Sequence, residues 1–168
     1  SAEIGRGNGF RILKVKWPAF GDVFAEGLLL EPEEVVSEAK GTGSRLGVHA
    51  VPDAVLAIPD ADQTPEQLVG LTDGIPLDSQ FARRLAESGC RVLIPSLVSR
   101  GMERRHSPGR QGGANLTHRE FLYRPAFELG RHLVGYELQK VLAGVDWFEK
   151  EIGPGAKIGV IGYGEGGM

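Results

Sequence analysis

The sequence KIGVIGYGEGGM, residues 157–168, carries the strongest indication of the fold. Its first part, residues 157–161, is a short apolar run of the kind that forms a strand covered on both faces. Four glycines follow between Gly162 and Gly167 and act as a turn signal. The stretch therefore predicts a buried strand that ends directly in a tight glycine turn.

One interpretation of this turn is a nucleophile elbow, G-x-Nuc-x-G-G. An elbow is a strained turn after a strand, and it needs small residues around the nucleophile. The nucleophile position falls on Gly164, which is flanked by Gly162, Tyr163, Glu165, Gly166 and Gly167. Glycine has no side chain that could attack a carbonyl carbon. The sequence therefore predicts the shape of an elbow without a catalytic residue.

A second interpretation is the dinucleotide fingerprint G-x-G-x-x-G, formed by Gly162, Gly164 and Gly167. It would make the chain an NAD(P)-binding enzyme whose Rossmann unit starts near Lys157. The acidic residue expected about 20 positions further on would lie beyond Met168. A third interpretation is a tight glycine turn that binds no ligand.

Working outward from this turn, apolar runs alternate with helical patterns. Strands are predicted at residues 10–17, 23–30, 54–59, 91–98 and 157–161, and a helix at 79–88. The first two strands should form an antiparallel hairpin. The remaining order predicts an α/β fold with a mainly parallel sheet and helices on both faces.

A long helix is predicted between the fourth strand and the last one. Thr117 and Glu120 fit a capping box, and Pro125 suits the first turn of a new helix. An apolar stripe then runs from Phe127 to Phe148 at helical spacing, so we expect this helix to reach about Glu151.

Composition excludes several classes of function. The chain has 168 residues and a net charge of −3, and its densest basic run, from Arg100 to Arg110, lies among glycines. This run is typical of a solvated loop, so no nucleic-acid partner is predicted. No apolar stretch reaches the length of about 18 residues that a membrane span needs. The chain starts at Ser1 rather than Met, which is compatible with an exported protein whose leader was removed; the compartment stays undetermined.

No metal or cofactor is predicted. The four histidines, at positions 49, 106, 118 and 132, show no metal-ligand spacing. Asp60 and Asp62 lie in a turn-rich loop, where acidic residues are more often turn formers than metal ligands. Cys90 is the only cysteine and precedes an apolar run, so we expect it to be a small buried residue.

Three stretches together resemble the acetyl xylan esterase and dienelactone hydrolase-like branch of the α/β-hydrolases. They are VFAEGLLLEP (23–32), IPDADQTPEQL (58–68), and GRHLVGYELQK (130–140), which leads to DWF (146–148). The resemblance covers roughly residues 10–168. It implies the N-terminal portion of a hydrolase fold, a single incomplete domain over residues 1–168 that ends at the elbow.

The resemblance also implies a site and a reaction. In an active relative, a serine at the elbow would attack an ester carbonyl, and backbone N–H groups at Ala61 and Glu165 would stabilise the oxyanion. In this chain the family's serine is Gly164, and the family's acid and histidine would follow Met168. Enzymatic activity is therefore left undecided: the family hydrolyses esters, whereas this chain lacks the nucleophile.

Two hypotheses follow from the resemblance. The first is a pseudoenzyme, which keeps the hydrolase fold without its chemistry. The second is a scaffold or interaction module that pairs with the remainder of a longer chain or with a protein complex.

Overall fold

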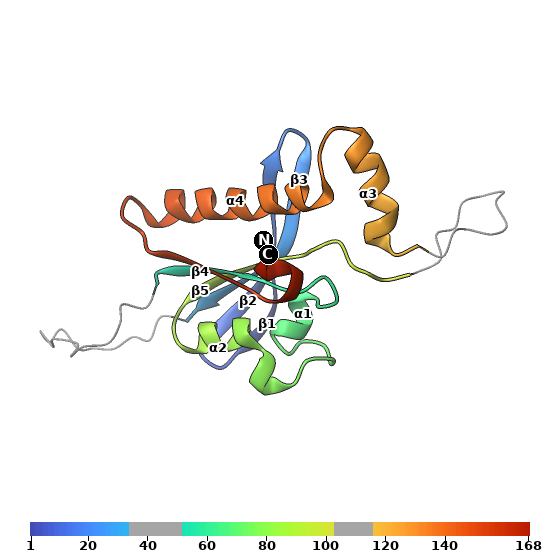
Figure 1. Cartoon of the computed structure of the whole chain (residues 1–168). Helices are drawn as coiled ribbons and strands as arrows, with labels where there is room; N and C mark the ends of the chain where they lie inside the picture. The colour runs from blue at the N-terminus through green and yellow to red at the C-terminus, as the bar shows by residue number, and fades with distance from the viewer. Residues whose placement is uncertain (34–51, 103–115) are drawn as a thin grey trace, which may run out of the picture.

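A six-stranded sheet forms the centre of the protein in a computed structural model, which describes residues 1–33, 52–102 and 116–168 (Figure 1). The strands lie side by side in the order β1-β2-β3-β5-β4-β6. They are β1 (Ala2–Gly7), β2 (Phe10–Phe20), β3 (Val23–Pro32), β4 (Ala54–Ile58), β5 (Arg91–Pro95) and β6 (Ile158–Gly162). The helices are α1 (Pro65–Leu68), α2 (Phe81–Glu87), α3 (His118–Glu128) and α4 (Leu133–Ile152), with 3-10 turns at Leu77–Ser79 and Gly164–Gly167.

The sheet is mixed, so the prediction of a mainly parallel sheet is wrong for the described part of the chain. The predicted hairpin of β2 and β3 is confirmed, but β1 and β5 also pair antiparallel with their neighbours β2 and β3. The parallel pairs are β4 with β5 and β4 with β6. Strand β1 was not predicted, because residues 2–7 include two charged residues and two glycines and form no apolar run.

Both faces of the sheet are covered by helices, as predicted (Figure 1). On one face, α1 and α2 contribute Leu68, Ala82 and Ala86 to a core that includes Phe10 and Leu30. Cys90 is buried in the same core, as expected.

On the other face, α4 packs over the sheet. Its side chains Val141 and Phe148 lie against Trp17, Leu56 and Leu93. The indole N–H of Trp17 donates a hydrogen bond of 3.0 Å to the carbonyl oxygen of Lys140, which fixes β2 to α4. These two cores hold β4 and β5 in place, and pairing with β4 sets the carboxyl end of β6 beside that of β4.

The long predicted helix is two helices, so the prediction that a helix begins at Pro125 is wrong. The capping box at Thr117 does start a helix, but this helix runs through Pro125 and ends near Gly130, whose φ of +83° suits a helix C-terminus. His132 then caps α4, and its Nδ1 accepts a hydrogen bond from the Val134 N–H at 3.4 Å. Phe127 belongs to α3 and is 63% exposed, outside the apolar stripe that α4 buries.

Smaller differences concern the loops. The loop predicted after β4 contains α1, which starts at a capping box made by Thr64 and Gln67. Strand β5 ends at Pro95, three residues before the predicted end. Most of the two longest predicted loops, together with His49 and His106, lies outside the described residues.

Candidate functional site

The glycine turn after β6 is packed so tightly that two of its positions admit only glycine. A Cβ atom at Gly162 would collide with the carbonyl oxygen of Gly166. A Cβ atom at Gly166 would lie 2.5 Å from the carbonyl oxygen of Pro59 and 2.6 Å from that of Ile58. The turn is therefore pressed against the carboxyl end of β4.

Gly164 has a φ of +58°, a conformation that L side chains rarely adopt. A Cβ atom at this position would lie 2.6 Å from Oδ1 and 2.8 Å from Oδ2 of Asp60. The carboxylate of Asp60 thus fills the space into which a side chain at position 164 would project.

The two N–H groups predicted for an oxyanion hole meet at this carboxylate. The Ala61 N–H donates to Asp60 Oδ1 at 2.9 Å, and the Glu165 N–H donates to the same oxygen at 3.0 Å. The Glu165 N–H is the main cause that lowers the pKa of Asp60; with the Ala61 N–H and Arg100 it outweighs the effect of burial. The structure therefore brings Ala61, Glu165 and Gly164 together. It also places the carboxylate of Asp60 at this position, although Asp60 was predicted to be a turn former.

Arg100 binds the acidic side chains around the turn. Its guanidinium lies 2.6 Å from Glu165 Oε1, 2.8 Å from Asp62 Oδ2 and 3.6 Å from Asp60 Oδ2. Hydrogen bonds to Glu165 and Asp62 raise the pKa of Arg100. The sequence predicts a solvated loop here, and the Arg100 side chain is 35% exposed, but its charge is paired with these carboxylates. Arg100 follows the buried strand β5 by five residues, and loops after such strands lie at the carboxyl edge of a sheet.

A buried ion pair between Arg119 and Glu137 lies next to the glycine turn. The Arg119 guanidinium donates to both carboxylate oxygens of Glu137, at 2.7 and 2.9 Å, and both side chains are about nine-tenths buried. Glu137 also accepts a hydrogen bond from the Val98 N–H at 2.9 Å. Burial lowers the pKa of Arg119, but the hydrogen bonds and charge of Glu137 outweigh it and raise that pKa.

The same arginine reaches the turn. Arg119 Nη2 lies 2.9 Å from Glu165 Oε2, close enough for an ion pair but without the alignment of a hydrogen bond. Sequence reasoning missed this pair. A signal was present, because Glu137 lies four residues from both Leu133 and Val141, on the apolar stripe of α4.

A hollow opens beside these charges, at the carboxyl ends of β4 and β5. It is lined by residues 61–66 and by Ser96, Leu97, Ser99, Arg100 and Gly101. At its rim, Ser99 Oγ lies 3.0 Å from Nδ1 of His118. In sheets with parallel strands, ligands bind at this edge, so the hollow and the turn form the candidate site.

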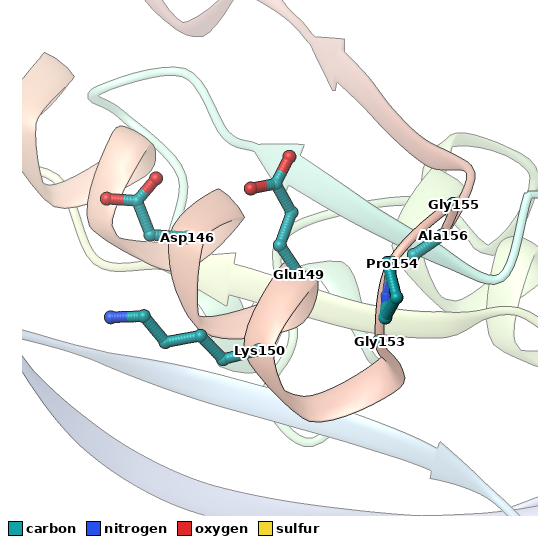
Figure 2. Close-up of a pocket in the computed structure, with 7 residues that line it drawn as sticks. All are labelled: Asp146, Glu149, Lys150, Gly153, Pro154, Gly155 and Ala156. Atoms are coloured by element: carbon teal, nitrogen blue, oxygen red, sulfur yellow. The ribbon is translucent and has the colours of Figure 1, made fainter.

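A second hollow lies at the opposite end of β6. Figure 2 shows Asp146, Glu149 and Lys150 projecting from the last turns of α4 beside the turn at residues 153–156, which leads into the strand. This end of the strand carries neither the glycine turn nor its N–H groups. We therefore do not assign the candidate site there.

Within residues 1–33, 52–102 and 116–168, no group of three or more His, Cys, Asp or Glu side chains could hold a metal ion. Asp60 and Asp62 both face Arg100 instead. None of the described helices is long and apolar enough to cross a lipid bilayer.

Comparison with known proteins gives the class of fold. The mixed α/β architecture is similar to that of a solved structure. One such structure is a putative acetyl xylan esterase from Bacteroides fragilis, with a TM-score of 0.64 and 18% sequence identity. The alignment covers 98% of this chain and 42% of the Bacteroides chain. At 18% sequence identity, the similarity indicates a shared fold and carries no information about activity. No protein-family profile and no curated protein matches the chain.

Proposed function

We propose that this chain is a non-catalytic member of the esterase-like proteins. The observation that carries the proposal is the position of the Asp60 carboxylate, which lies against Gly164 and accepts both N–H groups of the turn. An ester hydrolase of this type needs a nucleophile at that place and free N–H groups next to it.

The missing nucleophile and the occupied N–H groups would each, by itself, greatly reduce ester hydrolysis. A glycine at the nucleophile position leaves no atom that can form the acyl-enzyme. Loss of a single oxyanion donor typically lowers kcat by about 10² to 10³, and here Asp60 engages two donors. The carboxylate also places negative charge where negative charge would develop on the substrate oxygen.

The test is an esterase assay of the full-length protein with p-nitrophenyl acetate. We expect no turnover that a serine-directed reagent abolishes. Turnover that such a reagent removes stoichiometrically would refute the proposal, because it would show an active serine in place of the closed turn.

An interaction module is the second candidate function, and the exposed apolar side chains favour it. Val160 and Ile161 of β6 are 58% and 41% exposed, and Leu138 and Leu142 of α4 are 53% and 45% exposed. Apolar groups on the edge strand and on the neighbouring helix suit a protein contact. Light scattering of the full-length protein checks this: we expect an assembly, and a monomer that binds no hydrophobic dye would contradict it.

The dinucleotide hypothesis is the weakest of the three. A pyrophosphate would have to approach the turn at Gly164, where the carboxylate of Asp60 already lies. Like charges in this position repel. NADH titration of the full-length protein tests this hypothesis, and we expect no saturable binding.

A further inference from the structure

We infer that Ser99 and His118 form a nucleophilic pair, outside the glycine turn, in which the Ser99 hydroxyl accepts an acyl group from neutral activated esters. The hydroxyl is acylated once and keeps the acyl group. This inference goes beyond the proposed function, because that function concerns hydrolysis at the glycine turn and leaves both residues without a role.

The contact between the two side chains is that of a hydroxyl group with a base. Ser99 lines the hollow, and its Oγ lies 3.0 Å from Nδ1 of His118. When the ring hydrogen is on Nε2, Nδ1 of His118 accepts the hydroxyl hydrogen of Ser99. A serine hydroxyl is a weak nucleophile by itself and becomes reactive when a neighbouring base takes its proton.

Backbone contacts hold both members of the pair in place. The His118 N–H donates to the carbonyl oxygen of Gly101 at 3.0 Å. Directly before the serine, the Val98 N–H donates to Glu137 at 2.9 Å, and the Val98 carbonyl oxygen accepts from Arg119 at 2.9 Å. These contacts leave the two reacting atoms free of any positioning role.

The hydroxyl oxygen is accessible from one side because residue 101 is a glycine. A Cβ atom at Gly101 would lie 3.3 Å from Ser99 Oγ and 3.7 Å from Cε1 of His118. A side chain at this position would cover the pair. Ser99 is itself exposed, so an acyl donor can approach its Oγ from solvent.

The charges of the hollow favour a neutral donor. Asp62 and Glu66 both line it, and the positive charge of Arg100 is shared between Asp62 and Glu165. This lining repels an anion. A neutral aryl ester should therefore react more readily than an ester that carries a carboxylate.

The reaction is a single acyl transfer. Ser99 Oγ attacks the carbonyl carbon of p-nitrophenyl acetate, and the hydroxyl proton passes to Nδ1 of His118. The bond between the carbonyl carbon and the phenol oxygen breaks, and p-nitrophenolate leaves with the electron pair. His118 then releases its proton to water. The serine ester that forms has an alkoxide as its leaving group, so it is a much poorer electrophile and should persist.

The experiment measures the release of p-nitrophenolate by the full-length protein and locates the acetyl group by mass spectrometry of peptides. Hydroxylamine distinguishes the sites, because it removes acetyl groups from serine oxygen and leaves those on lysine nitrogen. The variants are Ser99→Ala and His118→Gln. The control is Ser88→Ala, whose exposed hydroxyl donates to the carbonyl oxygen of Arg84 at 2.8 Å.

For the unaltered protein and Ser88→Ala we expect a burst of one equivalent and an acetyl group on Ser99. Ser99→Ala should give no burst, and His118→Gln should react about 100-fold more slowly, as is typical when a general base is lost. A burst that survives in Ser99→Ala would overturn the inference, as would an unchanged rate in folded His118→Gln. If His118→Gln does not fold, the mapping in the unaltered protein decides, and acetyl groups on lysine alone would overturn the inference.

The donor class is tested with 4-acetoxybenzoate, an anionic ester. Each rate is divided by the rate of the same ester with free imidazole, which removes the difference in intrinsic reactivity. The neutral ester should be favoured by about twofold or more, and preference for the anion would overturn the assigned class.

The same measurements separate this inference from the proposed function. Absence of both turnover and acetyl-Ser99 would refute the inference alone. Sustained turnover together with a lasting acetyl group on Ser99 would refute the proposed function alone. A burst at Ser99 without later turnover supports both.

Discussion

Gly164 and Asp60 lie so close together that a side chain at position 164 and the present position of the Asp60 carboxylate exclude one another. The backbone of Gly164 adds a second restriction through its positive φ. Replacing glycine there has two costs, one from the backbone and one from displacing a carboxylate that holds two N–H groups.

Gly164→Ser should therefore destabilise the protein, and the loss should depend on Asp60. We expect a loss of about 2–4 kcal/mol, of which roughly 1–2 kcal/mol comes from the left-handed backbone. With Asp60→Gly in the background, the added loss should be smaller by about 1 kcal/mol or more, since neighbouring residues couple. Urea unfolding of the four proteins measures the coupling.

The control for this cycle is Gly159→Ser. A Cβ atom at Gly159 would make only ordinary contacts, 3.6 Å from Pro52 and Val55. Its effect should be about 1 kcal/mol or less and independent of Asp60. Additive effects of Gly164→Ser and Asp60→Gly would contradict the account given for position 164.

The free energy of unfolding should depend on pH through the carboxylate of Asp60. Asp60 has a pKa below its ordinary value in the folded protein, chiefly because the Glu165 N–H donates to it. Its contribution is therefore complete above the unfolded pKa of about 3.9 and is lost as the pH falls through the lower folded pKa. The stability difference between the unaltered protein and Asp60→Asn should be largest near pH 7 and shrink below about pH 4. Denaturant unfolding across this range measures it, and a difference that grows on acidification would contradict it.

Among the elements, the pair Arg119 and Glu137 connects α3 and α4 with the backbone of Val98, three residues after β5, and with the glycine turn. Helix α3 contributes no side chain to either hydrophobic core, whereas the side chain of its residue Arg119 is about nine-tenths buried. Its attachment to the rest of the protein therefore depends strongly on this pair.

Glu137→Ala should cost about 3–5 kcal/mol, because it leaves the Arg119 charge buried without its main partner. Arg119→Met combined with Glu137→Leu should recover most of this loss, since an apolar pair of similar volume carries no buried charge. Thermal unfolding compares the variants. The exposed pair of Lys16 and Glu26, 3.6 Å apart, supplies the control: Glu26→Ala should leave the midpoint nearly unchanged. Equal effects of the two alanine variants would contradict a special role for Glu137.

The sequence predicted elements with strong apolar patterns and missed those held by polar contacts. Strands β2 to β5 and the stripe of α4 were visible because burial on a sheet imposes a hydrophobic period. Strand β6 forms where it was predicted, but the prediction that it is buried on both faces is wrong: it lies at the edge of the sheet, and none of its residues is buried. Helix α3 was misread because its positions are not buried and Pro125 suggested a helix start. Strand β1 is mostly exposed and pairs only with β2, so its sequence carries little apolar pattern.

Part of the candidate site was predictable from local sequence patterns. The glycines from Gly162 to Gly167 and the loop at Ala61 can be recognised from their own sequences. The contacts of Asp60, Arg100 and Arg119 with Glu165 depend on how distant strand ends meet in space. No local pattern encodes these distances, and a single sequence does not show which acid faces which arginine.

At the scale of the whole molecule, the protein consists of one sheet between two helical layers, and α4 provides most of one layer (Figure 1). Phe148 is fully buried at the centre of this layer. The layer should therefore be sensitive to cavities under α4 and tolerant of changes on its outer side.

Phe148→Ala should lower the free energy of unfolding by about 3–5 kcal/mol. Leu142→Ala is the matched control on the same helix, because Leu142 is 45% exposed; it should cost about 1 kcal/mol or less. Urea titration followed by tryptophan fluorescence measures both, and similar losses for the two variants would contradict the burial described for α4.

The strand order has a consequence for the time course of folding. Strands β1, β2 and β3 are joined by short turns and can pair as soon as they collapse, whereas residue 30 must find residue 92, and residue 54 must find residue 158. Pairings between segments so far apart form slowly, since loop entropy is lost before contacts compensate. The N-terminal meander should therefore be the early-forming part of the chain. The glycine turn and its ion pairs with Arg100 and Arg119 should form last, after β6 has paired with β4.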